Sequence, residues 1–179
     1  EVPIENLPLA ENDHIGLAQD LAIKLPERSD DIIAFQLERT ENSDNVRKLE
    51  FVAPSVSASR PARDRFFASL AEEQNRRTES WVLEALENLH HPLRIEASEP
   101  YIHPSLLLLE EIQVTGDIFF PKRWLDATLQ NHRSATAVEQ VRQFLRERPD
   151  YNQQLRMKIL QSADMMYRAN RLATGTNAE

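Results

Sequence analysis

The chain has 179 residues, no cysteine and a formal net charge of −8, because 21 lysines and arginines oppose 29 aspartates and glutamates. A chain of this length forms one domain with its own core, and without cysteine it has no disulfides or thiolate metal sites. The excess of carboxylates disfavours binding to nucleic acids, and only 3 glycines are present, too few for phosphate-binding glycine loops or glycine-rich hairpins.

Apolar residues recur at three- to four-residue spacing along nearly the whole chain, which is the pattern of amphipathic α-helices. Caps and prolines divide the pattern into segments. In chain order they predict about nine helices, near residues 12–25, 29–40, 43–54, 62–70, 81–89, 104–115, 121–129, 134–145 and 150–172.

Four residues define predicted helix ends. Pro54 is expected to end the third helix, because a proline inside a helix removes a hydrogen bond. Gly116 follows the sixth, where a glycine in the left-handed conformation commonly ends a helix. Ser134 is expected to cap the eighth helix and Asp150 the ninth, because their side-chain oxygens can accept hydrogen bonds from free backbone amides.

Short connections make consecutive helices antiparallel neighbours, so the fold class is predicted to be all-α, with helix pairs stacked in the manner of HEAT and armadillo repeats. We expect a single helical domain over 1–179, with 1–12 as a linker and 173–179 as a frayed tail. The chain begins with Glu1 instead of Met, and we expect it to be a fragment of a larger protein. Its core should include mid-stripe residues, namely Trp81, Leu86, Phe144 and Ile159.

The longest clean apolar run, 106–109, has 4 residues, whereas a membrane-spanning helix needs about 20. We therefore expect no membrane span and a soluble protein, whose compartment, cytoplasmic or periplasmic, the sequence leaves open. Basic residues at Arg60, Arg63, Arg65, Arg76 and Arg77 have few interleaved aromatics, so no nucleic-acid partner is expected.

The residues that could carry chemistry form no complete catalytic constellation. No H-E-x-x-H zinc motif and no G-x-S-x-G nucleophile motif occurs. Glu87 and His90 have the spacing used in di-metal bundles, but such a site needs a second copy of the motif; His90 and His91 fit better as the end of a helix, where imidazoles can bond free carbonyls. The sequence thus predicts no catalytic residue, no metal ligand and no cofactor for this chain.

Several segments are similar, in the same order, to one protein family. They include DIIAFQLERT at 31–40, WVLEALENLHHPLR at 81–94, YIHPSL at 101–106 and EIQVTGDIFFPKRWL at 111–125. Together with RFFASL at 65–70 and KILQSAD at 158–164, they resemble the C-terminal helical region of bacterial zinc aminopeptidases of the aminopeptidase N family. The resemblance extends over roughly 29–172.

The resemblance implies a non-catalytic domain that covers the catalytic cleft and walls the substrate chamber of a metallopeptidase. Zinc would then belong to the parent enzyme, and the partners would be the missing catalytic domain and peptide substrates. Arg94, Lys122 and Arg123 are candidates to pair with a peptide carboxylate; the competing interpretation is that they are surface cations or helix-end partners. The alternative function is a free-standing helical-repeat scaffold that binds a protein on its concave face.

Overall fold

The computed structural model describes residues 9–174, and every regular element in this range is a helix, which confirms the predicted all-α class. Four of the elements are single 3-10 turns, at Pro26–Arg28, Glu73–Arg76, Pro92–Arg94 and Glu99–Tyr101. The α-helices are α1 (Glu11–Lys24), α2 (Ser29–Arg39), α3 (Ser43–Val56), α4 (Arg60–Ser69), α5 (Glu79–Leu89), α6 (Ile95–Ser98), α7 (Ile102–Leu107), α8 (Leu109–Thr115), α9 (Phe120–Leu129), α10 (Ala135–Glu147) and α11 (Gln153–Thr174).

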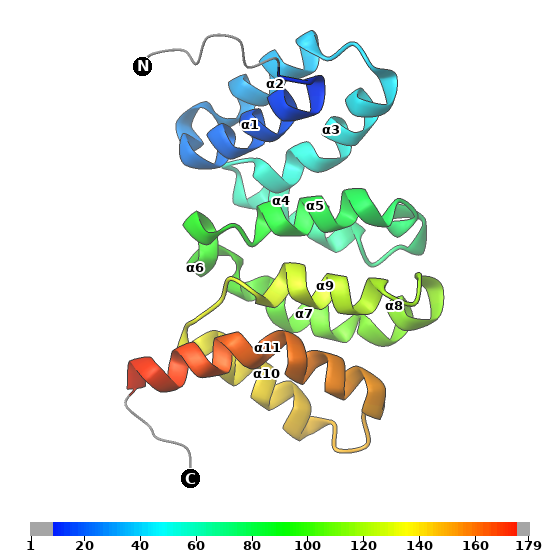
Figure 1. Ribbon diagram of the computed structural model, residues 1–179, viewed down its shortest axis with the longest axis vertical. Helices are drawn as coiled ribbons and strands as arrows, with labels where there is room; N and C mark the ends of the chain where they lie inside the picture. The colour runs from blue at the N-terminus through cyan, green and yellow to red at the C-terminus, as the bar shows by residue number, and fades with distance from the viewer. Residues whose placement is uncertain (1–8, 175–179) are drawn as a thin grey trace.

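The helices stack along the long axis of the molecule in two layers (Figure 1). In the first layer α1 packs on α3, α3 on α5, α5 on α9 and α9 on α11. The second layer consists of α2, α4, α7 and α10. Helix α2 packs against α1 and α3, α4 packs against α3, α7 against α9, and α10 against α11. Helices next to each other in the first layer are therefore separated in sequence by a helix of the second.

The space between the layers is filled by apolar side chains in two clusters. The larger cluster runs from α3 to α11 and contains the fully buried Phe120, Trp124 and Phe144. The smaller one holds α1, α2 and α3 together around residues such as Ile15 and Leu49. Burial of this kind contributes about 1.5–3 kcal/mol per large side chain, and it is what holds the stack together.

The predicted core is largely confirmed. Leu86, Phe144 and Ile159 are completely buried. Trp81 is only half-buried, contrary to the prediction, because it lies in the first turn of α5 at the edge of the stack, with its ring 6.0 Å from that of Phe51. The position of a residue along its helix, and not only its face, thus sets its burial.

Two predicted helix ends are wrong, and at a third only the predicted backbone conformation is wrong. Helix α3 passes through Pro54 and ends at Val56; the hydrogen bond that Pro54 cannot donate would have reached the carbonyl of Glu50, an exposed residue. The helix before Gly116 ends at Thr115, as predicted, but Gly116 is extended (φ −97°, ψ 175°) and not left-handed. Asn152 and not Asp150 begins α11, because its Oδ1 accepts from the amides of residues 154 and 155 at 3.0 and 3.1 Å.

Other boundaries follow the prediction more closely. Ser134 caps α10 as expected, with its Oγ 3.0 Å from the amide nitrogen of Ala137. The helix predicted at 104–115 is divided into α7 and α8, and the short α6 was not predicted. Helices reach into both predicted termini, as far as Glu11 and Thr174; residues 1–8 of the predicted linker and 175–179 of the predicted tail lie outside the described residues. Between residues 9 and 174 no helix is long and apolar enough to cross a membrane.

Candidate functional site

The middle helices of the first layer, α5 and α9, each have a narrow strip of solvent-accessible residues, and these residues include charged side chains. Both helices are packed by a neighbour on either side within the layer. On α5 the strip contains the half-buried Glu84 and the exposed Glu87, and on α9 it contains the exposed Arg123. Together with the polar side chains linked to them, these residues form a group that we call the polar face, in which Gln19 and Asn88 are buried: Gln19, Lys48, Glu84, Glu87, Asn88, Lys122, Arg123 and Asp126.

In the upper half of the polar face, Glu84 joins three helices. Its Oε2 lies 2.5 Å from Nζ of Lys48 on α3, and its Oε1 accepts a hydrogen bond of 2.8 Å from Nε2 of Gln19 on α1. Gln19 in turn accepts from Nδ2 of Asn88 on α5 at 2.9 Å. The Glu84 carboxylate is therefore paired and fixed in position, and these polar contacts tie the first three helices of the layer together.

In the lower half, Asp126 has a similar linking role. Nζ of Lys122 lies 2.5 and 2.7 Å from its two carboxylate oxygens, and Oγ of Ser162 on α11 donates to Oδ1 at 2.8 Å. Lys122 is thus neutralised by a residue one helical turn away. Only part of its charge remains to act on anything outside the chain.

Glu87 and Arg123 lie between these two halves. The pKa of Glu87 is raised, chiefly by burial and then by the charge of Glu84, while the Arg123 guanidinium opposes the rise. Arg123 is exposed, and within residues 9–174 its guanidinium makes no hydrogen bond or close ion pair. Of the predicted cations, Arg123 is thus the one whose hydrogen-bond donors remain free.

The third predicted cation, Arg94, is engaged with the backbone. Its guanidinium donates to the carbonyls of Ser55, Val56 and Ser57, at the C-terminal end of α3. Arg63 also donates to the carbonyl of Ser57, at 2.7 Å. Burial, and then the charge of Arg63, lower the pKa of Arg94 to about 10. Arg94 therefore satisfies helix-end carbonyls, which is one of the two interpretations that the sequence left open.

The three predicted cations do not form one cluster. Arg94 lies beyond the C-terminal end of α5, whereas Lys122 and Arg123 lie in the first turn of α9. Both helices run from right to left in Figure 1, so these positions are toward opposite ends of the stack's width. The nearest partners also differ, since Arg94 binds carbonyls and Lys122 binds Asp126.

A buried histidine pair lies between α5 and the α9–α10 connection, and the sequence did not predict it. Nδ1 of His90 is 2.9 Å from Nε2 of His132, and both side chains are completely buried. Burial, and next the charge of His132, put the pKa of His90 well below its ordinary value; burial and the charge of Arg133 lower the pKa of His132 to about 4. The two histidines are 42 residues apart, so no local spacing indicated the contact, and His90 bonds a second imidazole instead of helix-end carbonyls.

The polar face offers fixed carboxylates and one free guanidinium, which suit the binding of a polar or charged chain, whereas its amide side chains, Gln19 and Asn88, are buried and bonded to each other. In the described part of the chain no three His, Asp or Glu side chains are grouped as metal ligands. No protein-family model, curated protein or solved structure matches this chain. A functional assignment therefore depends on the geometry of the polar face and on the sequence resemblance.

Proposed function

We propose that this chain is the non-catalytic C-terminal helical domain of a zinc-dependent aminopeptidase, and that its polar face walls the chamber in which peptides lose their N-terminal residues. Its helix pairs would then be HEAT/armadillo-like repeats. The zinc and its ligands would belong to the catalytic domain of the parent polypeptide, and the partners of this chain would be that domain and the peptide substrate. The chain itself would contribute the shape and charge of the wall.

The observation that carries the proposal is the free guanidinium of Arg123 on the open side of the first layer. A peptide that presents its amino end to a distant zinc ion must leave its carboxylate elsewhere in the chamber. Arginine binds carboxylates through two parallel hydrogen bonds, so Arg123 can receive that end. Lys122 would add positive potential, although Asp126 compensates most of its charge.

The first test is the reading frame upstream of Glu1, where the proposal requires a thermolysin-type zinc motif. The second uses the full-length enzyme with Lys122→Gln and Arg123→Gln together. We expect the KM for peptides with a free carboxylate to rise several-fold and that for a single-residue anilide, which has no such carboxylate, to stay unchanged. The matched control is Arg146→Gln, which removes an exposed arginine of α10 that pairs with Glu139.

Two outcomes would overturn the proposal. If the upstream reading frame lacks a zinc motif, this chain does not belong to a zinc aminopeptidase. If the ratio of kcat/KM between peptide and anilide stays the same in the double variant and in the control, the polar face has no contact with substrate, and the chain only supports the catalytic domain. The isolated chain is expected to hydrolyse neither substrate, because the activated water of such enzymes is bound to zinc.

The second candidate is a free-standing scaffold that binds a protein partner. One observation favours it: an apolar groove with an exposed aromatic ring, Phe35, lies between α1 and α2. The presence or absence of the upstream zinc motif separates the two candidates.

A further inference from the structure

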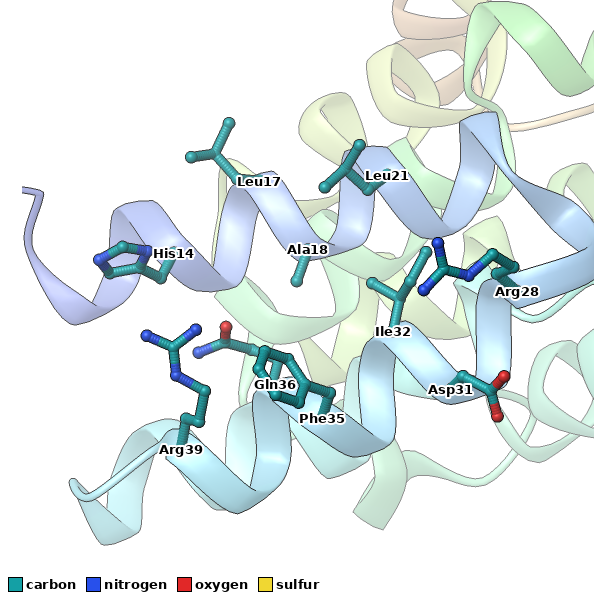
Figure 2. A pocket seen from close by; sticks show the side chains of 10 residues that line it. All are labelled: His14, Leu17, Ala18, Leu21, Arg28, Asp31, Ile32, Phe35, Gln36 and Arg39. Carbon is teal, nitrogen blue, oxygen red and sulfur yellow. The ribbon is translucent and has the colours of Figure 1, made fainter. Parts of the chain in front are cut away.

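The first two helices leave an apolar groove open at the end of the stack (Figure 2). Its exposed apolar side chains are Leu17 and Leu21 on α1, with 49% and 46% of their surface accessible, and Phe35 on α2, with 58%. Between the helices the side chains of Ala18 and Ile32 point toward each other and form the floor. The apolar residues lie one turn apart on each helix, which is the spacing that a third helix packed across two others requires.

The stack already contains the same arrangement on the other side of this helix pair. Helix α3 packs on both α1 and α2, and α9 packs likewise on α5 and α7. Terminal helices of stacked-helix proteins normally carry a polar outer face, because nothing covers them. The α1–α2 pair has an apolar outer face instead, so its outer side has the character of an interior surface.

Two arginines and one aspartate lie around the groove, so its local charge is positive whereas the charge of the whole chain is negative. Arg28 lies at one end of the groove, near Asp31, and His14 and Arg39 lie at the other (Figure 2). Within residues 9–174 the Arg28 side chain makes no hydrogen bond or ion pair, and the Arg39 guanidinium lies 5.2 Å from the centre of the Phe35 ring without a carboxylate partner. Two unpaired arginines therefore frame the groove in a chain whose formal net charge is −8.

We propose that the α1–α2 groove binds an amphipathic helix whose apolar row is flanked by carboxylates. The apolar row would cover Leu17, Leu21 and Phe35, and the carboxylates would pair with Arg28 and Arg39. The proposal goes beyond the proposed function and does not depend on it, because the groove and its charges are the same whether or not this chain belongs to an aminopeptidase.

The test measures binding of two designed peptides to the 179-residue chain by fluorescence anisotropy at low salt. The probe is an 18-residue helix with leucines along one face and glutamates beside them; the comparison peptide has the same leucines and lysines in place of the glutamates. We expect the glutamate peptide to bind at least tenfold more tightly. Arg28→Glu with Arg39→Glu should reverse this preference, because the framing charges change sign.

A second set of variants tests the apolar contacts. Leu21→Gln should weaken binding of the glutamate peptide about tenfold, the factor that burial of one leucine contributes. Leu107→Gln is the matched control, because Leu107 on α7 is similarly exposed, at 51%, and lies outside the groove; it should leave binding unchanged. Both leucines are half exposed, so both variants should fold, which circular dichroism checks.

Three results would overturn the proposal. The first is equal affinity for both peptides in the parent chain, which would mean that the arginines select nothing. The second is that the glutamate peptide does not bind at all, or that Leu21→Gln and Leu107→Gln weaken its binding by the same factor. The third is a parent chain that forms dimers by analytical ultracentrifugation and becomes monomeric with Leu21→Gln, because the occupant would then be a second copy of this chain.

Discussion

The imidazoles of His90 and His132 are in hydrogen-bond contact, with 2.9 Å between Nδ1 of the first and Nε2 of the second, in a part of the core that water does not reach. The ring of Tyr101 packs near His90, and the positive charge of Arg133, after burial, lowers the pKa of His132. Within residues 9–174 neither imidazole is hydrogen-bonded to a carboxylate that could compensate a proton on this pair. The pair is therefore stable only while both rings are neutral.

This pair should make the stability of the protein depend on pH. The pKa of His132 is about 4 in the folded protein and near 6.5 in the unfolded chain. Between these two pH values the folded protein therefore binds fewer protons than the unfolded chain. The stability that is present above pH 6.5 is lost as the pH falls toward 4. Between pH 7 and pH 5 the loss from His132 should be about 2 kcal/mol. Urea unfolding of the parent and of His132→Gln at both pH values measures it; the variant should lose less stability over this interval, and an equal loss in both would contradict the prediction.

Shortening Ile159 should weaken the contact between α11 and the rest of the stack. The side chain is completely buried in the larger apolar cluster. Ile159→Ala should cost about 2–5 kcal/mol of unfolding free energy, because it removes buried methyl groups and leaves a cavity. Leu160→Ala is a control on the next residue, whose side chain is 36% exposed, and it should cost clearly less. Equal melting temperatures for the parent and Ile159→Ala would show that the assigned register of α11 is wrong.

Two glycines should respond in opposite directions to the same substitution. A Cβ atom at Gly116 would lie 2.6 Å from Cδ1 of Phe120 and 2.9 Å from the carbonyl oxygen of Ile112. Gly116→Ala should therefore destabilise the protein by about 1–3 kcal/mol through overpacking. A Cβ at Gly16, in the exposed part of α1, meets nothing within 4 Å, so Gly16→Ala should stabilise it by about 0.5–1 kcal/mol. Thermal unfolding of both variants tests the pair, and a neutral Gly116→Ala would mean that Phe120 moves aside freely.

Arg94 should matter for folding through its hydrogen bonds to the end of α3. Arg94→Gln leaves the carbonyls of Ser55 and Val56 without these donors, and we expect a loss of about 1–3 kcal/mol in urea unfolding. Arg47→Gln, which removes an exposed arginine of the same helix α3 that pairs with Asp44, should change stability by less than about 0.5 kcal/mol. Unchanged stability of Arg94→Gln, combined with weaker peptide binding in the full-length enzyme, would instead favour the substrate role.

The fold class and most helices could be predicted from the sequence, because the information lies in near neighbours. The spacing of apolar residues, the scarcity of glycine and the Ser134 cap are local features, and a helix depends on contacts three and four residues apart. The prediction was wrong where a helix end depends on distant groups. Pro54 lies inside α3. The carbonyls at the C-terminal end of α3 accept hydrogen bonds from Arg63 of α4 and from Arg94 of the turn after α5.

The candidate site was predicted only in part, for a related reason. The sequence placed Lys122 and Arg123 in the turn before a helix, whereas both lie inside α9. It also did not show that Asp126 compensates Lys122 while Arg123 remains free beside Glu87. It also could not connect His90 with His132, because short connections specify that consecutive helices are neighbours but not which helices further apart in the chain meet.

What the sequence determined by itself is that this chain is helical, because α-helical hydrogen bonds close within four residues and apolar periodicity selects the buried side of each helix. Only the tertiary structure decided which buried sides meet, and therefore which polar groups were left on open surfaces. Packing in two layers placed Glu84 and Glu87 on α5 beside Arg123 on α9 and, within residues 9–174, left the outer side of α1 and α2 uncovered. Contacts between helices depend on shape complementarity summed over many residues, which no short segment of sequence contains.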